Sequence, residues 1–446
     1  MSRVERHERE KLSEKEVTEI PSHDKAPSTP DAKNTQTTSM QDLKPAKTKF
    51  AKRKPRKKTI LTIIISLLAI NVVVISAILL TRDLALKGDA EMSINVGDEF
   101  KDPGTNMQSK VSGKVDVDVP GDYTLTYTKG DQKVTRVVHV VDPANLVLGL
   151  YGDEQTRVKI GDPYIESGAY GIDKTSGPIT EYKTSGEVDT SKEGSYEIKY
   201  TFKVGNLTKT IKRTVNVIAE KDFTADSDGI SVLMYHYVYT ANDTPASVNG
   251  NYILDTDLKA QLDYLQKNDY YFPSFTELRA YIDGKISLPE KSVILTFDDG
   301  AQYFLSYGLP ILNEYKIPAT SFLIGVQGGP EKVTEYASSY VAFESHSYDM
   351  HRPGGNVGHG GVISAMSKAD IVSDLKKAAD FTGANHAFAF LYGDITEDGK
   401  AAVAECGIEC AFSTVYGRVE VGEDYRALDR IRVQGANSLE SWIATL

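Results

Sequence analysis

Hydrophobic and polar positions follow three different patterns along the chain, and each change of pattern marks a boundary. Residues 59–80 form a run of 22 residues without a charge. Residues 88–219 contain short alternating segments broken by Gly, Asp and Pro, which is typical of small β-sandwiches. From Asp222 onward, short apolar runs alternate with helical patterns. That alternation predicts an α/β domain with a parallel sheet over residues 222–446.

The middle segment consists of a unit that occurs twice. The matching stretches are Ile94–Phe100 with Val158–Tyr164, and Gly121–Tyr127 with Gly194–Tyr200. We therefore predict two all-β sandwich repeats, at residues 88–142 and 146–219, which are similar to the immunoglobulin-like modules of bacterial surface proteins. Neither repeat contains a cluster of catalytic residue types, so both are interpreted as spacers or weak wall-binding modules.

The third segment is predicted element by element. The expected strands are 230–235, 293–297, 319–324, 340–343, 387–391, 411–414 and 430–433. The expected helices are 255–267, 276–283, 310–315, 368–381 and 396–406. Strand 293–297 (Val-Ile-Leu-Thr-Phe) is almost continuously apolar, as expected for a parallel strand covered on both faces.

Charge changes the interpretation of the first 81 residues. The chain as a whole carries −11, yet residues 1–58 hold 16 Lys/Arg against 9 Asp/Glu. Nine of these basic residues lie between Lys44 and Lys58 with no acidic residue among them. A basic run can bind nucleic acid, but this one has little aromatic interleaving and adjoins a membrane-length segment. We therefore predict no nucleic-acid partner.

The uncharged run predicts a transmembrane helix at residues 59–81. As a helix, its 22 residues would extend about 33 Å, enough to cross a bilayer. The basic cluster before it places residues 1–58, a polar segment expected to be disordered, in the cytoplasm, and everything after Thr81 outside the cell. A cleaved signal peptide is the competing interpretation. It is disfavoured because the run exceeds an ordinary signal core and no clear cleavage site follows.

Candidate chemistry begins where strand 293–297 ends, at Asp298 and Asp299. Adjacent carboxylates repel each other, so they form either a solvated turn or part of a metal-and-base site. Two histidines, His346 and His351, follow the apolar run 340–343. One carboxylate and two imidazoles suit Zn²⁺ or a similar ion and leave positions open for water and substrate. Five residues of helix would turn about 500°, so a strand end with its loop is the better setting for this pair.

These residues resemble the motifs of carbohydrate esterase family 4, the polysaccharide deacetylases with a NodB-homology domain. Residues 296–300 read Thr-Phe-Asp-Asp-Gly, and the paired histidines have four residues between them instead of the usual three. The resemblance covers roughly residues 229–446 and implies a distorted (β/α) barrel. It also implies that Asp299, His346 and His351 bind a divalent metal, most simply Zn²⁺, and that Asp298 is the general base.

Two departures from the family pattern concern the acid and an arginine. Many members take their acid from a C-terminal histidine motif, but no histidine follows His386. Residues 232–236 (Val-Leu-Met-Tyr-His) resemble the N-terminal motif of the poly-N-acetylglucosamine deacetylase branch, so His236 is the predicted acid. The third motif retains Tyr392, a predicted substrate contact, but lacks its usual arginine. Arg430 or Arg432 is the predicted replacement.

The sequence therefore predicts a membrane-anchored, extracellular, metal-dependent hydrolase that removes N-acetyl groups from an amino-sugar polymer. Peptidoglycan and poly-N-acetylglucosamine both remain open as substrates. The alternative is a catalytically impaired surface protein that binds glycan. The two cysteines, Cys406 and Cys410, are compatible with a disulfide or with two buried thiols.

Overall fold

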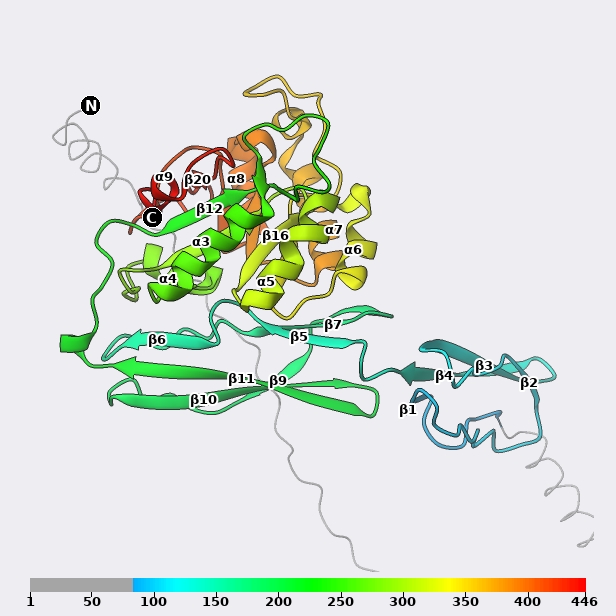
Figure 1. Cartoon of the computed structure of the whole chain (residues 1–446). Helices are drawn as coiled ribbons and strands as arrows, with labels where there is room; N and C mark the ends of the chain where they lie inside the picture. The colour runs from blue at the N-terminus through cyan, green and yellow to red at the C-terminus, as the bar shows by residue number, and fades with distance from the viewer. Residues whose placement is uncertain (1–82) are drawn as a thin grey trace, which may run out of the picture. The chain divides into compact units, whose positions relative to one another are not determined.

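The computed structural model describes residues 83–446 (Figure 1). The predicted cytoplasmic tail (1–58) and transmembrane helix (59–81) lie outside these residues. Between residues 83 and 446, no helix combines the length and the apolar character needed to cross a bilayer.

The second repeat is a two-sheet sandwich, as expected. One sheet has the order β6-β11-β10-β9 and the other the order β5-β7-β8. The strands are β5 (Leu146–Leu150), β6 (Gln155–Lys159), β7 (Ala169–Asp173), β8 (Gly177–Ile179), β9 (Tyr182–Ser185), β10 (Gly194–Val204) and β11 (Leu207–Ile218).

The first repeat differs, because it forms one four-stranded sheet, in the order β1-β4-β3-β2. Its strands are β1 (Glu91–Asn95), β2 (Lys110–Ser112), β3 (Gly121–Lys129) and β4 (Gln132–Val141). Opposite this sheet, only an isolated bridge between Leu86 and Thr105 forms. The first repeat lacks a second sheet because the corresponding stretch of its sequence is shorter. Between Gly104 and Ser112 there is no room for the strands β7 and β8 that the second repeat forms between the matching Gly168 and Ser185.

The C-terminal domain is built on a curled, seven-stranded parallel sheet with the order β19-β18-β17-β16-β15-β12-β20. Its strands are β12 (Ser231–Tyr235), β15 (Val293–Phe297), β16 (Ala319–Leu323), β17 (Val341–Ser345), β18 (Ala387–Ala389), β19 (Cys410–Phe412) and β20 (Ile431–Arg432). The edge strands do not pair directly, but Leu428, between them in sequence, forms one parallel bridge to Phe412. This arrangement fits the predicted distorted barrel.

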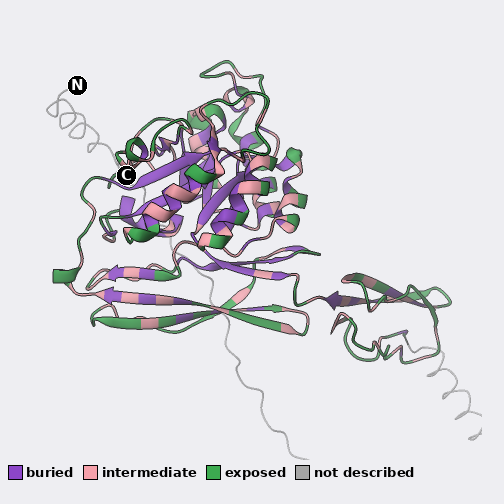
Figure 2. Cartoon of the chain, viewed as in Figure 1, coloured by how far each residue is buried: buried purple, intermediate pink, exposed green. Residues whose placement is uncertain are grey.

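Helices surround this sheet, which lies at the centre of the domain's core (Figures 1 and 2). They are α3 (Asp255–Lys267), α4 (Phe275–Ile282), α5 (Leu309–Tyr315), α6 (Gly329–Glu335), α7 (Lys368–Thr382), α8 (Glu397–Glu405) and α9 (Leu439–Ile443). All five residues of β12, β15, β16 and β17 are buried. Strands β12 and β15 are mostly apolar, as expected for covered parallel strands, whereas β16 and β17 also bury polar residues, among them Ser321 and Glu344. Helix α4 begins with a capping box between Ser274 and Glu277, which fixes its start.

Two short features beyond β12 were not predicted: a pair of strands and a helical turn. Strand β13 (Tyr237–Tyr239) pairs in parallel with β14 (Tyr252–Leu254). A π-helical turn at Phe304–Gly308 lies just after the Asp-Asp-Gly stretch. Both elements adjoin the carboxyl ends of β12 and β15, where the sheet presents its candidate chemistry.

The second repeat contacts the amino-terminal side of the parallel sheet. The backbone N–H of Asp153 donates to the carbonyl of Phe272 (2.8 Å), and Arg157 forms an ion pair with Asp269 (2.6 Å). Ser167 hydrogen-bonds Glu277 (3.2 Å). These contacts give the repeat a structural role in the C-terminal domain, in addition to any role as a spacer.

Candidate active site

Three predicted ligands meet at the carboxyl edge of the sheet. Asp299 follows β15, His346 follows β17, and His351 lies in the next loop. The Nε2 atoms of His346 and His351 are 3.5 and 3.4 Å from the same Asp299 oxygen, Oδ1. The three ligand atoms all lie within 4.8 Å of one another. Residues five apart in sequence therefore converge through a loop, as expected.

The geometry of these residues suits a divalent metal ion. Two ligand atoms that are each about 2.0–2.1 Å from a tetrahedral Zn²⁺ lie about 3.3–3.5 Å apart, which matches the two histidine-to-aspartate distances of 3.5 and 3.4 Å. His346 is positioned by a hydrogen bond between Nδ1 and the carbonyl of Ala389 (2.8 Å). With the proton on Nδ1, the Nε2 lone pair is free to face an ion. Tyr237 donates a hydrogen bond to the other Asp299 oxygen (2.6 Å).

The electrostatics keep Asp299 ionised. Burial alone would raise the pKa of this carboxyl, but His346, His236 and the Tyr237 hydroxyl hold it well below its usual value. Burial would likewise lower the pKa of His346, yet the two neighbouring aspartates raise it above the ordinary value. Asp299 is therefore available as an anionic ligand at neutral pH.

Left-handed backbone conformations gather around the ligands. Asp299, Ser347 and Tyr392 have φ angles of 71°, 77° and 57°, which non-glycine residues adopt infrequently. The loop between the histidines is held by buried Asp374 of α7, which accepts hydrogen bonds from the N–H groups of Tyr348 (2.7 Å) and Asp349 (2.8 Å). This anchor explains how four intervening residues still bring both imidazoles to one point.

Asp298 is buried beside the ligands and is held by Arg430. The guanidinium donates to both carboxylate oxygens, each at 2.8 Å, and also to Thr296 Oγ1 at 3.1 Å. Burial would raise the pKa of Asp298, but the charge and hydrogen bonds of Arg430 lower it below the ordinary value. Arg432 instead hydrogen-bonds Asn251 (2.8 Å). Of the two arginines considered from sequence, Arg430 is therefore the one that orients this carboxylate.

His236 directly follows β12, the strand beside β15 in the sheet. Its Nδ1 atom is buried and has no hydrogen-bond partner among residues 83–446. Burial lowers the pKa of the imidazole, while Asp298 and Asp299 act in the opposite direction. A buried, unpaired nitrogen next to two carboxylates is a site where a proton or a substrate atom can be received.

Tyr392 lies beside His351, whereas His359 lies in an exposed loop. The ring of Tyr392 is 4.6 Å from that of His351, and its side chain is partly open to solvent. His359 belongs to an exposed loop tied to buried Asp394, which accepts hydrogen bonds from the N–H groups of His359 and Gly361, each at 2.7 Å. Tyr392 thus adjoins the ligand cluster, whereas His359 is anchored by Asp394.

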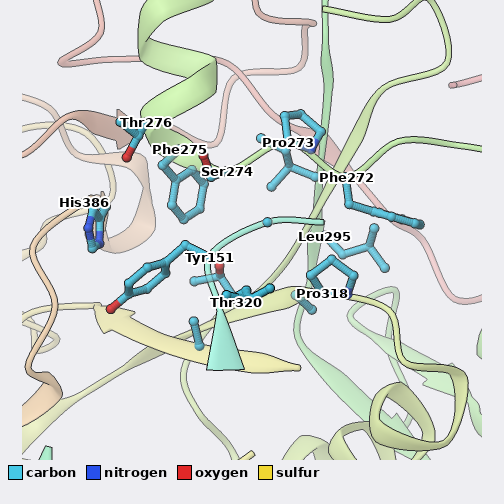
Figure 3. Close-up of a pocket in the computed structure, with 15 residues that line it drawn as sticks. Tyr151, Phe272, Pro273, Ser274, Phe275, Thr276, Leu295, Pro318, Thr320 and His386 are labelled. Carbon is cyan, nitrogen blue, oxygen red and sulfur yellow. The ribbon is translucent and has the colours of Figure 1, made fainter. Parts of the chain in front are cut away.

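His386 lies at the opposite edge of the sheet, because it precedes β18 instead of following a strand. Its Nδ1 is 2.9 Å from Glu344 Oε1, and its ring is 4.3 Å from that of Tyr151 in the second repeat. Figure 3 shows these two rings together at one side of a small cavity of about 30 Å³. His386 is therefore a contact between the repeat and the sheet.

Both cysteines are free thiols. Cys410 is buried and its sulfur faces the carbonyl of Phe275, while the sulfur of Cys406 faces that of Val372. Of the two arrangements left open by the sequence, the structure has separate thiols.

Sequence reasoning missed Tyr237 and Asp374. Tyr237 had a weak signal, because Tyr-Val-Tyr alternates directly after His236. Asp374 had none, since it lies inside an ordinary amphipathic helix.

The C-terminal domain thus combines a parallel β/α fold with a cluster of metal-type ligands, and the comparisons with known proteins identify its kind. Residues 285–411 match the family model for polysaccharide deacetylase. Residues 84–140 and 148–217 match the model for the Ig-like domain of bacterial surface proteins. The chain therefore carries a polysaccharide deacetylase domain, a hydrolase of amide bonds, which follows two Ig-like domains in the sequence.

Curated relatives include the poly-beta-1,6-N-acetyl-D-glucosamine N-deacetylases of Staphylococcus aureus and Staphylococcus epidermidis. The S. aureus protein (strain MRSA252) is 26% identical over 207 residues, covering 41% of this chain and 70% of the relative. The S. epidermidis protein is 29% identical over 198 residues, covering 41% and 68%.

Two solved structures are also similar. The Streptococcus pyogenes deacetylase PplD in complex with acetate is 22% identical, with a TM-score of 0.41 over 50% of this chain and 99% of that one. IcaB from Ammonifex degensii is 26% identical, with a TM-score of 0.39 over 49% and 95%.

Proposed function

We propose that this protein is a metal-dependent N-deacetylase that removes acetyl groups from N-acetylated amino sugars of a surface polysaccharide. The observation that carries the proposal is the convergence of three metal-type ligands with a buried carboxylate–arginine pair at one strand edge. The names of the curated relatives favour poly-β-1,6-N-acetylglucosamine over peptidoglycan as the polymer.

Asp299, His346 and His351 would hold the ion, for which Zn²⁺ is the best match to two imidazoles and a carboxylate. A divalent ion there supplies Lewis acidity, which makes a water molecule easier to deprotonate and an amide carbonyl easier to attack. Tyr237 and the Ala389 carbonyl keep two of the ligands in place, through Asp299 and His346 respectively.

Asp298 is the base in this proposal. Its lowered pKa keeps it ionised at neutral pH, so it can take the proton of the attacking water. Arg430 fixes both carboxylate oxygens, which orients the base and prevents the side chain from rotating away. The arginine absent from the third motif thus has a counterpart, which weakens the alternative of a non-catalytic glycan-binding protein.

His236 is the proposed acid, which delivers a proton to the amine as the carbon–nitrogen bond breaks. It adjoins the two aspartates and its buried Nδ1 is unpaired within the described part of the chain. Tyr392, beside His351, forms a wall against which a sugar can pack.

We further propose that the catalytic domain is extracellular and that residues 59–81 anchor it in the membrane as a single span. The basic run that ends at Lys58 supports this orientation. The match of both repeats to Ig-like domains of bacterial surface proteins supports the same location.

The test is to incubate the purified full chain with poly-β-1,6-N-acetylglucosamine and, separately, with peptidoglycan, and to measure released acetate and new free amines. We expect acetate from the first polymer, and none after the metal is removed with a chelator. The His346→Ala variant is the matched inactive control. Glycan binding without acetate release from either polymer would favour the non-catalytic alternative.

A further inference from the structure

A row of tyrosines leads away from the ligand cluster along the β13–β14 pair. Tyr237 and Tyr252 are register partners on the two strands, so their side chains share one face. The intervening Val238 and Ile253 point to the other face and are buried, with 0% and 2% exposure. The tyrosine face is only partly covered. The pair thus presents its aromatic side outward and its aliphatic side to the core.

The row continues onto the π-helical turn that follows the Asp-Asp-Gly stretch. The ring centroid of Tyr252 is 4.7 Å from that of Tyr237 and 5.9 Å from that of Tyr303. Tyr307, one helical turn further, is 6.1 Å from Tyr303. Tyr303 and Tyr307 are half-buried, whereas Phe304 between them is fully buried. We call Tyr237, Tyr252, Tyr303 and Tyr307 the tyrosine track.

The tyrosine track begins at the ligand cluster itself. The hydroxyl of Tyr237 donates to Asp299, a proposed metal ligand, at 2.6 Å. At another ligand of the cluster, the ring of Tyr392 lies 4.6 Å from that of His351. Partly exposed tyrosines therefore adjoin two different ligands of the proposed reaction centre. A site for a single sugar would need only one such wall.

We propose that the tyrosine track binds consecutive sugars of an extended glycan, so that an acetylated residue inside the chain, with sugars on both sides, reaches the catalytic residues. The inference rests on the proposed function and adds the length and position of the substrate. The aliphatic faces of pyranose rings pack on aromatic rings. A tyrosine hydroxyl can also accept a hydrogen bond from a sugar hydroxyl, even at Tyr237 and Tyr307, where its own proton is donated to a carboxylate. Each centroid-to-centroid step of the track is comparable to the length of a pyranose ring.

A purely structural role would predict a different distribution of burial. Tyrosines that serve only to fill a core are covered by neighbouring side chains, as Tyr235 and Tyr271 are in this domain. Around the tyrosine track, the fully covered core positions are Val238, Ile253 and Phe304, and Tyr307 is the track residue that also packs against the core. Tyr237, Tyr252 and Tyr303 are only partly covered.

The first experiment compares chain lengths. We would measure kcat/KM of the full chain for the β-1,6-linked N-acetylglucosamine dimer and hexamer, and take the hexamer-to-dimer ratio. Tyr252→Ala and Tyr303→Ala should each lower this ratio roughly three- to tenfold, the value of one aromatic contact. Tyr123→Ala changes a partly exposed strand tyrosine in the first repeat and should leave the ratio unchanged. Metal content and melting temperature of each variant check that the site and the fold are intact.

The second experiment keeps the inference distinct from the proposed function. Calorimetric binding of the hexamer to the metal-depleted full chain requires no catalysis, and Tyr303→Ala should weaken it by a similar factor. If the wild type deacetylates no oligomer yet binds the hexamer through the track, the proposed function fails and the binding inference stands. The inference would be overturned if folded variants of the tyrosine track kept the wild-type hexamer-to-dimer ratio of kcat/KM and the wild-type affinity for the hexamer.

The position of attack gives a third outcome. Mass spectrometry of the partly deacetylated hexamer should find the first free amine at an internal residue. First deacetylation at a terminal residue would contradict binding on both sides of the reaction centre.

Discussion

The Asp298–Arg430 pair is the contact on which the proposed base chemistry depends. Both groups are buried, and both carboxylate oxygens are occupied by one guanidinium. Removing Arg430 outright would leave a buried unpaired charge, at a cost of about 3–5 kcal/mol, and would test folding more than function. A lysine retains the charge but cannot form the two parallel hydrogen bonds.

We therefore predict that Arg430→Lys keeps its metal and loses roughly 10- to 100-fold in kcat, because the base is no longer held in one orientation. Arg432→Lys is the matched control, since Arg432 bonds Asn251 and not an aspartate of the site. Steady-state kinetics with metal analysis on both variants check the prediction. Equal losses in the two variants would contradict the role assigned to Arg430.

His236→Ala should retain metal and lose roughly two to four decades of turnover, the usual contribution of a general acid. The protonated imidazole is the active form, so activity should fall as pH rises through its pKa, which burial places below 6.5. The variant should lack this fall in its pH–kcat/KM profile. His359→Ala, in the exposed loop, serves as control. Near wild-type turnover in His236→Ala, with an unchanged profile, would remove His236 from the mechanism.

At the scale of elements, long apolar or amphipathic segments were predictable and short ones were not. Helix 255–267 matches the structure residue for residue, because an amphipathic pattern defines it. The apolar strand before Asp298 ends at Phe297, as expected from its continuous burial. Strands β13 and β14 have three residues each and are too short to show a period. Strand 387–391 was predicted too long, since Leu391 and Tyr392 turn out of the sheet and Tyr392 adopts a left-handed φ.

The same contrast holds within the site. A motif adjacent to a strand end could locate Asp298, Asp299 and His346, because parallel strands bring their carboxyl ends together. Arg430 could only be guessed, since 132 residues separate it from Asp298 and no local pattern records their contact.

The stability that the second repeat and its interface contribute should depend on pH through Asp153. Burial raises the pKa of this carboxyl to about 6, above the ordinary value of 3.8. The folded protein therefore holds a proton that the unfolded chain loses between about pH 4 and pH 6. This group's contribution to the free energy of unfolding consequently falls as pH rises through that window.

Asp153→Asn should remove this contribution while keeping an oxygen to accept the hydrogen bond from the Gln155 N–H (2.9 Å). We predict that the difference in melting temperature, variant minus wild type, increases as pH rises from 4.5 to 7. Calorimetry on the full chain measures it. Asp162→Asn is not a suitable control, because Asp162 also bonds the sheet domain, through the Ser287 N–H. Glu187→Gln, at an exposed position of the same repeat, is suitable. Parallel melting curves of wild type and Asp153→Asn across this range would contradict the assigned titration.

For the whole molecule, the prediction concerns topology. If residues 59–81 anchor the chain with Lys58 inside, protease added to intact cells stripped of their wall should remove the Ig-like and deacetylase domains. An antibody against residues 1–58 should still detect a membrane-bound fragment. Protection of the deacetylase domain, with loss of the first 58 residues, would reverse the proposed orientation.

The central claim is that one site combines three metal ligands with a separate base. It is tested most directly by measuring metal content and acetate release from poly-β-1,6-N-acetylglucosamine for wild type, His346→Ala and Asp298→Asn. We predict about one ion per chain and acetate from wild type, loss of both in His346→Ala, and retained ion without turnover in Asp298→Asn. Full acetate release by the Asp298→Asn variant, or by wild type depleted of metal, would contradict the account.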